Sequence, residues 1–190
     1  MGRWASRGCY GVAGPTRWRR YAADVRFELE QRIPAPYDAV VSTSLDESYQ
    51  RSLTNLPPLR NREVVEQREM EDGRILRVTR CVLALNAGSA VKRFIGDEDP
   101  AWVEEAIWHP EESQWTWNVI PEVAKELLSA AGTIALAEGD GETHRRVIGD
   151  VKVRVPLYGG KVEGWIVDGL ERTYQEESRR LVEWLERENA

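Results

Sequence analysis

Four tryptophans lie close together in the sequence, and their rings are the side chains whose type and spacing best suit ligand binding. Trp102 and Trp108 are an even number of residues apart in one expected strand, as are Trp115 and Trp117 in the next. Side chains alternate across a strand, so each pair shares a face of the sheet. On an inner face these rings would line a cavity for a flat apolar ligand. Core packing, the commoner use of aromatic rings, or an outer partner surface would produce the same pattern.

Small residues in two other segments would leave the space that such a ligand needs. The segment 126–138 holds a run of small side chains around Gly132, and the expected C-terminal helix contains Gly164 and Gly169. Glycine inside a helix costs about 1 kcal/mol relative to alanine, so these positions need a compensating benefit. Room for a ligand or close packing on the sheet would supply it. With these glycines we count Trp165, beside the apolar stripe of the same helix, as a candidate ligand-binding residue.

Three charged residues interrupt the otherwise apolar expected strands, namely Arg77, Arg80 and Glu104. Charged side chains are rarely buried without a partner, so we expect all three to point outward. Any of them that pointed inward would be the polar anchor of a cavity.

The sequence offers little support for metal, nucleophilic or phosphate chemistry. His109 and His144 each border a turn, and neither has a second His or Cys at ligand spacing, so no metal site is expected. The chain contains neither a Gly-x-Ser-x-Gly nucleophile elbow nor a phosphate-binding loop. We therefore expect no cofactor, and no catalytic residue can be named.

The composition bounds the class of protein. The chain has 190 residues, of which 42% are hydrophobic, which suits one domain with a real core rather than global disorder. A net charge of −6 argues against a nucleic-acid partner. Cys9 and Cys81 suggest no disulfide framework, so we expect a reducing, cytoplasmic location. No stretch approaches the ~20 apolar residues that span a bilayer, and the oligomeric state is left open.

Residues 1–23 differ from the rest of the chain. They contain five arginines and four glycines but no acidic residue, and they lack the run of about 7–15 apolar residues that a secretory signal needs. We expect a disordered, dispensable extension ahead of a domain at 24–190. A basic arm for an acidic partner is the alternative.

The periodicity of the apolar residues predicts the elements that position these side chains. Alternation indicates a strand at 24–33, and helical spacing follows from Pro36 to a stop before Pro57. Six further strands are expected at about 60–70, 74–85, 101–109, 114–120, 126–138 and 142–155, before a long helix at 160–188. Short turns between the strands imply an antiparallel meander, whose one apolar face the closing helix would cover.

Two stretches of sequence resemble a known superfamily. Residues 33–40, IPAPYDAV, resemble the passage from first strand to first helix in the START-like superfamily, also called SRPBCC or the polyketide-cyclase and Bet v 1-like group. Residues 149–163, GDVKVRVPLYGGKVE, are similar to one uncharacterised bacterial branch, domain of unknown function 2505. The resemblance covers about 24–188. It implies an α+β helix-grip fold, with a curved antiparallel sheet of about seven strands around a long C-terminal helix and short helices after the first strand.

The resemblance implies a range of functions rather than one. The superfamily includes lipid carriers, hormone receptors, aromatase/cyclases, dehydratases and chaperone activators, and the branch brings no catalytic residues to carry over. Our first hypothesis is that the protein binds or carries a hydrophobic small molecule (a lipid, isoprenoid or polyketide-like compound) between sheet and C-terminal helix. A cyclase or dehydratase in the same cavity, or a protein-interaction module without a ligand, are the alternatives. A purely apolar pocket would favour the carrier, a polar pair in the pocket the enzyme, and a sealed core the interaction module.

Overall fold

A computed structural model describes residues 25–84, 99–123, 125–126, 128–154 and 159–188. The expected extension at 1–23 lies outside these residues. The elements are β1 (Val25–Ile33), α1 (Tyr37–Leu45), α2 (Glu47–Ser52), β2 (Leu59–Glu69), β3 (Ile75–Leu83), β4 (Ala101–His109), the 3₁₀ turn η1 (Pro110–Glu112), β5 (Gln114–Pro121), β6 (Leu128–Glu138), β7 (Thr143–Val153) and α4 (Gly159–Glu188). The expected order of strand, short helices, six strands and long helix is confirmed.

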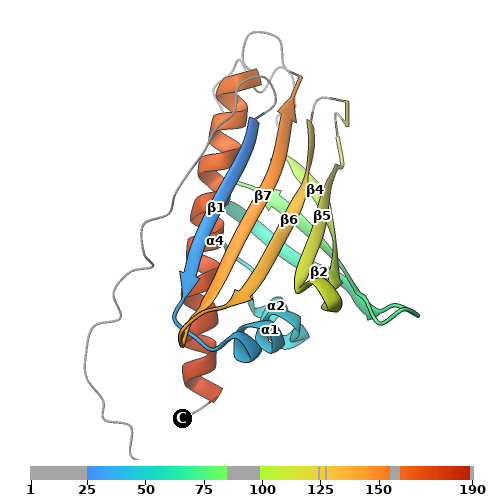
Figure 1. The fold of residues 1–190 in the computed structure, drawn as a ribbon. Helices are drawn as coiled ribbons and strands as arrows, with labels where there is room; N and C mark the ends of the chain where they lie inside the picture. The colour runs from blue at the N-terminus through green and yellow to red at the C-terminus, as the bar shows by residue number, and fades with distance from the viewer. Residues whose placement is uncertain (1–24, 85–98, 124, 127, 155–158, 189–190) are drawn as a thin grey trace, which may run out of the picture.

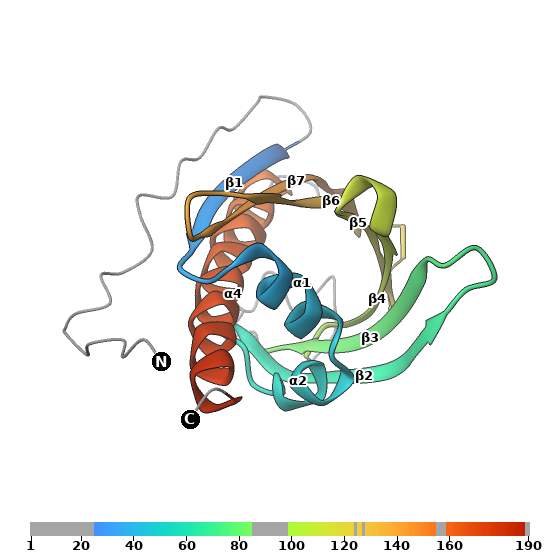
Figure 2. The same ribbon diagram turned by 60° about the horizontal axis from the view of Figure 1, so that its bottom comes forward.

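The seven strands form one antiparallel sheet in the order β1-β7-β6-β5-β4-β3-β2. Strands β2 to β7 follow one another as a meander, and β1 closes the order by pairing with β7. Figure 1 shows α4 running along the concave side of the sheet. In Figure 2 the sheet curves around the interior, α4 lies across the open side between β1 and β2, and α1 and α2 cover one end. This is the predicted helix-grip arrangement.

Local sequence explains where the elements begin and end. In β1, Phe27, Leu29 and Ile33 are fully buried, as the alternation predicts. The helical region after Pro36 divides at Asp46, whose extended backbone ends α1 and whose carboxylate accepts the N–H of Tyr49 at 2.6 Å to cap α2.

The closing helix packs one apolar stripe onto the sheet. Val167 and Leu181 are almost fully buried, and Ile166, Leu170 and Tyr174 are partly buried against the same core. Helix α4 contacts β1, β7 and α1, so it ties the first and last strands to the helical cap. Among the described residues, no helix is both long enough and apolar enough to cross a membrane.

Candidate functional site

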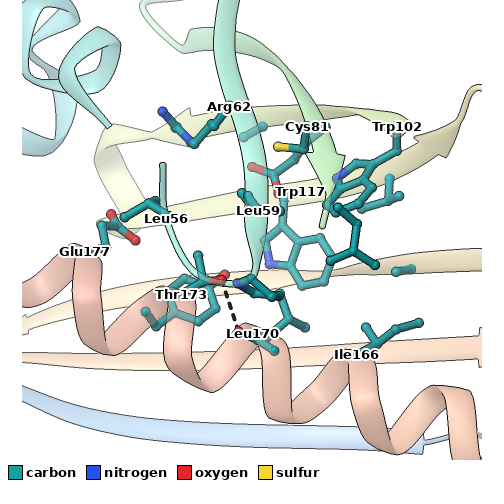
Figure 3. A pocket seen from close by; sticks show the side chains of 18 of the residues that line it. Leu56, Leu59, Arg62, Cys81, Trp102, Trp117, Ile166, Leu170, Thr173 and Glu177 are labelled. Carbon is teal, nitrogen blue, oxygen red and sulfur yellow. Dashed lines mark hydrogen bonds between the residues drawn. The ribbon is translucent and has the colours of Figure 1, made fainter. Parts of the chain in front are cut away.

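The main internal feature is a cavity of about 810 Å³ between the concave face of the sheet and α4. Most of its wall is apolar, and Figure 3 shows Ile166 and Leu170 of α4 on the opposite side from Trp102 and Trp117 of the sheet. The apolar residues that border it include Leu56, Leu59, Leu83, Val119, Leu128, Ala130, Ile134 and Leu136. A volume of this size lies in the range typical of small-molecule sites.

Three of the four candidate tryptophans border this cavity. Trp102, Trp115 and Trp117 line it from β4 and β5. Trp108 is not among the lining residues, because it is buried beside Trp115, its partner in the β4–β5 ladder, with ring centroids 5.5 Å apart. All four side chains therefore share the inner face, and Trp108 packs beside Trp115 without bordering the cavity.

Two glycines in neighbouring strands of the sheet let aromatic rings pack directly against the backbone. Gly149 of β7 pairs with Gly132 of β6. In the same row across the sheet, Gly149 also pairs with Phe27 of β1, and Gly132 pairs with Trp117 of β5. A Cβ at Gly132 would lie 2.7 Å from the Trp117 ring, and one at Gly149 would lie 2.6 Å from the Phe27 ring. Gly132 is absent from the cavity lining, and a Cβ there would also lie 2.1 Å from the carbonyl oxygen of Ile148, so glycine is needed for close packing against β7 and the Trp117 ring.

Of the α4 glycines proposed from the sequence as ligand-binding residues, one borders the cavity and one does not. Gly169 borders the cavity, and a Cβ there would lie 3.1 Å from Cγ of Pro58, which indicates close packing. Gly164 does not border the cavity, and open space would surround its Cβ. The side chain of Trp165 lies outside the described part of the chain.

The expectation that all three strand charges point outward is wrong for two of them. Arg80 is at the surface and pairs with Glu122 at 2.6 Å, as expected. Arg77 and Glu104 instead border the cavity. Burial becomes tolerable for Arg77 because its guanidinium donates to Gln67 Oε1 and to the carbonyl of Ser44, and lies 4.5 Å from the Trp115 ring centroid. Burial lowers the pKa of Arg77 to about 9.

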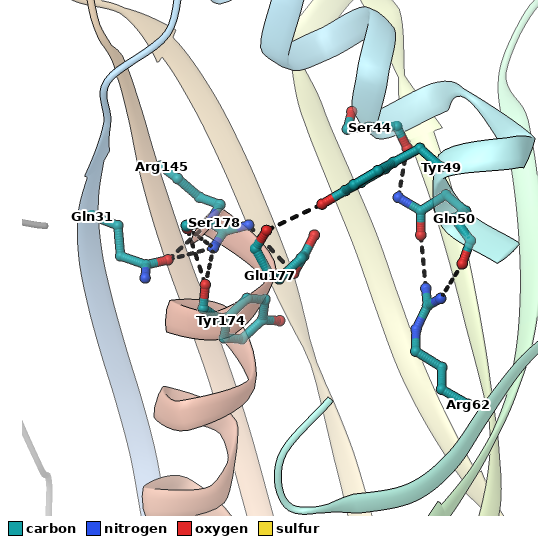
Figure 4. A network of polar contacts seen from close by, with 9 residues as sticks. All are labelled: Gln31, Ser44, Tyr49, Gln50, Arg62, Arg145, Tyr174, Glu177 and Ser178. Atoms are coloured by element: carbon teal, nitrogen blue, oxygen red, sulfur yellow. Dashed lines mark hydrogen bonds and ion pairs between the residues drawn. The ribbon is translucent and has the colours of Figure 1, made fainter. Parts of the chain in front are cut away.

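A second buried arginine joins three elements at the same end of the molecule. Arg145 of β7 donates to Gln31 Oε1 in β1 at 2.9 and 2.6 Å, and to the Tyr174 carbonyl and Ser178 hydroxyl of α4 at 2.8 Å each. Its remaining nitrogen lies 3.4 Å from Glu177 Oε2. Figure 4 shows this network between β1 and α4. These contacts connect β7 to β1 and α4, so we assign Arg145 a structural role.

A third arginine faces the cavity from β2. Arg62 donates to the carbonyl and the side-chain oxygen of Gln50 at 2.8 Å each, and Gln50 in turn donates to the Ser44 carbonyl. The hydroxyl of Tyr49 donates to the Glu177 carbonyl at 3.1 Å, and burial raises its pKa. Burial also raises the pKa of the Cys81 thiol to about 12. At neutral pH these two groups are therefore uncharged.

Glu104 differs from these groups because no described residue pairs with it. Its carboxyl makes no hydrogen bond or ion pair within the described part of the chain. The side chain is partly exposed, and it borders the cavity. Burial raises its pKa; nearby Arg62 and Arg77 oppose the shift and Glu177 adds to it. A raised pKa favours the protonated form of this carboxyl, which can donate a hydrogen bond as well as accept one.

Replacing Glu104 with glutamine is expected to stabilise the protein increasingly as the pH rises. The pKa of Glu104 is raised in the folded state, so folding retains a proton that the unfolded chain has released, and stability falls as the pH rises through that window. Glutamine removes this dependence. The charged and titratable groups around Glu104 are Arg62, Arg77 and Cys81 from the sheet and Tyr174 and Glu177 from α4, and all remain in the variant.

Thermal melts would measure this effect as the difference in Tm between variant and parent. We expect almost no difference at about pH 4 and a clearly higher Tm for the variant at about pH 8. A difference that is constant across this range would contradict a raised pKa at Glu104.

Sequence reasoning missed Arg62, Arg145, Tyr174 and Glu177 as cavity residues. A signal existed for Arg145, because it is in phase with the buried Val147 and Val151 and lies opposite Gln31, the one break in the apolar face of β1. No metal-binding group of three or more His, Cys, Asp or Glu side chains occurs among the described residues.

The curved sheet, the gripping helix and the cavity between them define a START-like fold. The chain belongs to the family described as "Protein of unknown function (DUF2505)", whose model matches residues 28–185. No curated protein matches the sequence.

Solved structures share the fold at low sequence identity. The Zhui aromatase/cyclase from Streptomyces sp. R1128 superposes with a TM-score of 0.61 at 14% identity, covering 88% of this chain and 97% of that one. A START superfamily protein from Mycobacterium smegmatis gives 0.57 at 14% identity, over 85% and 99%. TTHA0849 from Thermus thermophilus gives 0.60 at 17% identity, over 83% and 97%. At these identities the similarity shows the fold alone.

Proposed function

We propose that the protein binds or carries an apolar small molecule in the cavity between the sheet and α4. The observation that supports this most is a cavity of about 810 Å³ whose walls are mainly aliphatic and aromatic. Protein interiors normally pack to the density of organic crystals, and empty apolar volume is destabilising. A cavity of this size is best accounted for by a ligand that fills it. It also weighs against a protein-interaction module with a sealed core.

The apolar tryptophan wall suits a lipid, isoprenoid or polyketide-like compound. Trp102 and Trp117 offer broad rings, and Ile166 and Leu170 offer flexible aliphatic contacts across from them. Such a wall binds through apolar burial, at about 25 cal/mol for each Å² removed from water.

A second candidate function is an enzyme of the cyclase or dehydratase type. The observation that favours it is Glu104, a carboxyl with a raised pKa in the same cavity as the phenol of Tyr174. A neutral buried carboxyl is suited to general-acid catalysis. The fold neighbour Zhui is an aromatase/cyclase, which is consistent with this alternative.

Native mass spectrometry of the protein purified from its source organism would test the proposal. We expect a population heavier than the polypeptide by one small molecule, which extraction into organic solvent releases. Recovery of that molecule unchanged after incubation would support the carrier, and conversion to a product would support the enzyme. A protein that retains no small molecule and binds none of a panel of fatty acids, isoprenoids and aromatic polyketides would contradict both.

A further inference from the structure

Two polar groups border the cavity without a partner among the described residues. The carboxyl of Glu104 and the hydroxyl of Tyr174 make no hydrogen bond there, although both side chains line a mainly apolar wall. Polar groups in a protein interior are normally hydrogen-bonded, so two unpartnered groups beside one cavity require an explanation. A ligand with hydrogen-bonding oxygen atoms would supply the missing partners.

The neighbouring charged groups are already committed elsewhere. Arg77 donates to Gln67 and to the Ser44 carbonyl, and Arg62 donates twice to Gln50. Neither arginine is within ion-pair distance of Glu104 in the described structure. The carboxyl is therefore positioned beside the cavity rather than used to hold the sheet together.

The phenol of Tyr174 is directed away from the arginine that holds its backbone. The Tyr174 carbonyl accepts from Arg145, whereas its hydroxyl points away from Arg145 in Figure 4. Burial, with a smaller contribution from the charge of Glu104, raises the pKa of this phenol, so it stays protonated. A phenol donates a hydrogen bond, and so does a carboxyl in the protonated form that burial favours, which suits an oxygen acceptor on the ligand.

The charges around the cavity leave no free counter-ion for a charged ligand group. An ammonium would meet three arginines, and a carboxylate would meet Glu177 and arginines that already donate to protein acceptors, namely Arg62, Arg77 and Arg145. Either ion would also lose its hydration on entering an apolar cavity, which is costly for an ion without a dedicated partner. An uncharged hydroxyl or carbonyl avoids both penalties.

We propose that the ligand is an uncharged apolar molecule bearing a hydroxyl or carbonyl group, and that Glu104 and Tyr174 recognise this oxygen. This inference rests on the proposed ligand-binding function, and it identifies Glu104 and Tyr174 as the part of the cavity that selects the ligand. The selection separates neutral oxygenated compounds from fatty acids and from amines, which have similar apolar bodies.

One flat hydrocarbon skeleton with different substituents tests this selection. The probes are pyrene, 1-hydroxypyrene, 1-acetylpyrene, 1-pyrenecarboxylate and 1-pyrenemethylammonium, and energy transfer from the cavity tryptophans to the pyrene ring reports binding. We expect the hydroxyl and acetyl probes to bind about tenfold more tightly than pyrene, and both ions to bind more weakly than pyrene.

Variants of Glu104 locate the selection. In Glu104→Leu, the advantage of 1-hydroxypyrene over pyrene should fall below about threefold, while pyrene itself binds at least as well as before. Glu104→Gln, which keeps a hydrogen-bonding group, should retain the preference, and Tyr174→Phe should reduce it by a smaller factor. Both changes at Glu104 remove a buried unpaired carboxyl, so the variants are expected to fold.

Two patterns of result would overturn the inference. If pyrene and the oxygenated probes bind with equal affinity, or if 1-pyrenecarboxylate binds most tightly, no neutral oxygen is selected. A preference that is unchanged in Glu104→Leu would show that another group selects it. Failure of every probe to bind is distinguishable from these, since it would contradict the proposed function itself and this inference with it.

Discussion

Replacing Arg145 with methionine is expected to lower the free energy of unfolding by about 3–5 kcal/mol. Arg145 connects Gln31, Ser178 and the Tyr174 carbonyl, and it lies 3.4 Å from Glu177. Methionine approximates the length of the side chain but leaves these groups without their donor. The loss is large because each abandoned group is wholly or partly buried, so water does not fully replace the arginine.

The adjacent Arg146 is the matched control for this experiment. It points to the opposite face of β7, where 54% of its side chain is exposed, and it pairs with Glu28 at 2.6 Å. Exposed ion pairs contribute about 0–1 kcal/mol, so Arg146→Met should barely change the midpoint of urea unfolding. Equal losses for the two variants would show that Arg145 does not tie the sheet to α4.

Periodicity predicted the fold because one face of nearly every element is buried. The alternation of Phe27 and Leu29 identified β1, and the helical spacing of Ile166, Leu170 and Leu181 identified the closing helix. Each pattern is local, so it can be found without knowing the partner. Val167 was missed beside that stripe because its burial depends on how the helix is rotated against the sheet.

The site was only partly predictable, because its composition depends on contacts between distant strands. Sequence spacing placed the tryptophans in pairs on strand faces, but the β4–β5 register decides that Trp108 packs beside Trp115 and does not itself border the cavity. That register is set by the turn at η1, and it is not visible in the spacing within either strand.

The inward charges were mispredicted for a different physical reason. Glu104 is in phase with Trp102 and Trp108, which was a signal for the inner face, but burying a carboxyl without a partner is ordinarily too costly. The cavity changes this balance, because a ligand can act as the missing partner. Arg77 is buried for another reason, since Gln67 and Ser44 supply acceptors from β2 and α1.

Filling the cavity with a phenyl ring is expected to abolish ligand binding without unfolding the protein. Ala130 borders the cavity from β6, in the ladder row that also contains Val119 and Glu104. In Ala130→Phe the ring would occupy the ligand's space and bury its own apolar surface, so stability should be kept or raised by about 1–2 kcal/mol. Affinity for an apolar probe such as pyrene should fall about 100-fold, or ~2.7 kcal/mol.

The next residue along β6 supplies the control. Ala131 is exposed on the outer face of the sheet, so Ala131→Phe adds the same ring outside the cavity. It should leave pyrene binding within about twofold of the parent, which is well under 1 kcal/mol. Unfolding of Ala130→Phe would be recognised by urea titration of the same preparation.

The most direct test of a ligand cavity between sheet and helix is therefore a pyrene titration of the parent protein, Ala130→Phe and Ala131→Phe side by side. The account predicts saturable binding to the parent and to Ala131→Phe, with one site per chain, and none in the same concentration range to a folded Ala130→Phe. Equal binding by all three proteins would place the ligand elsewhere and contradict the cavity as the functional site.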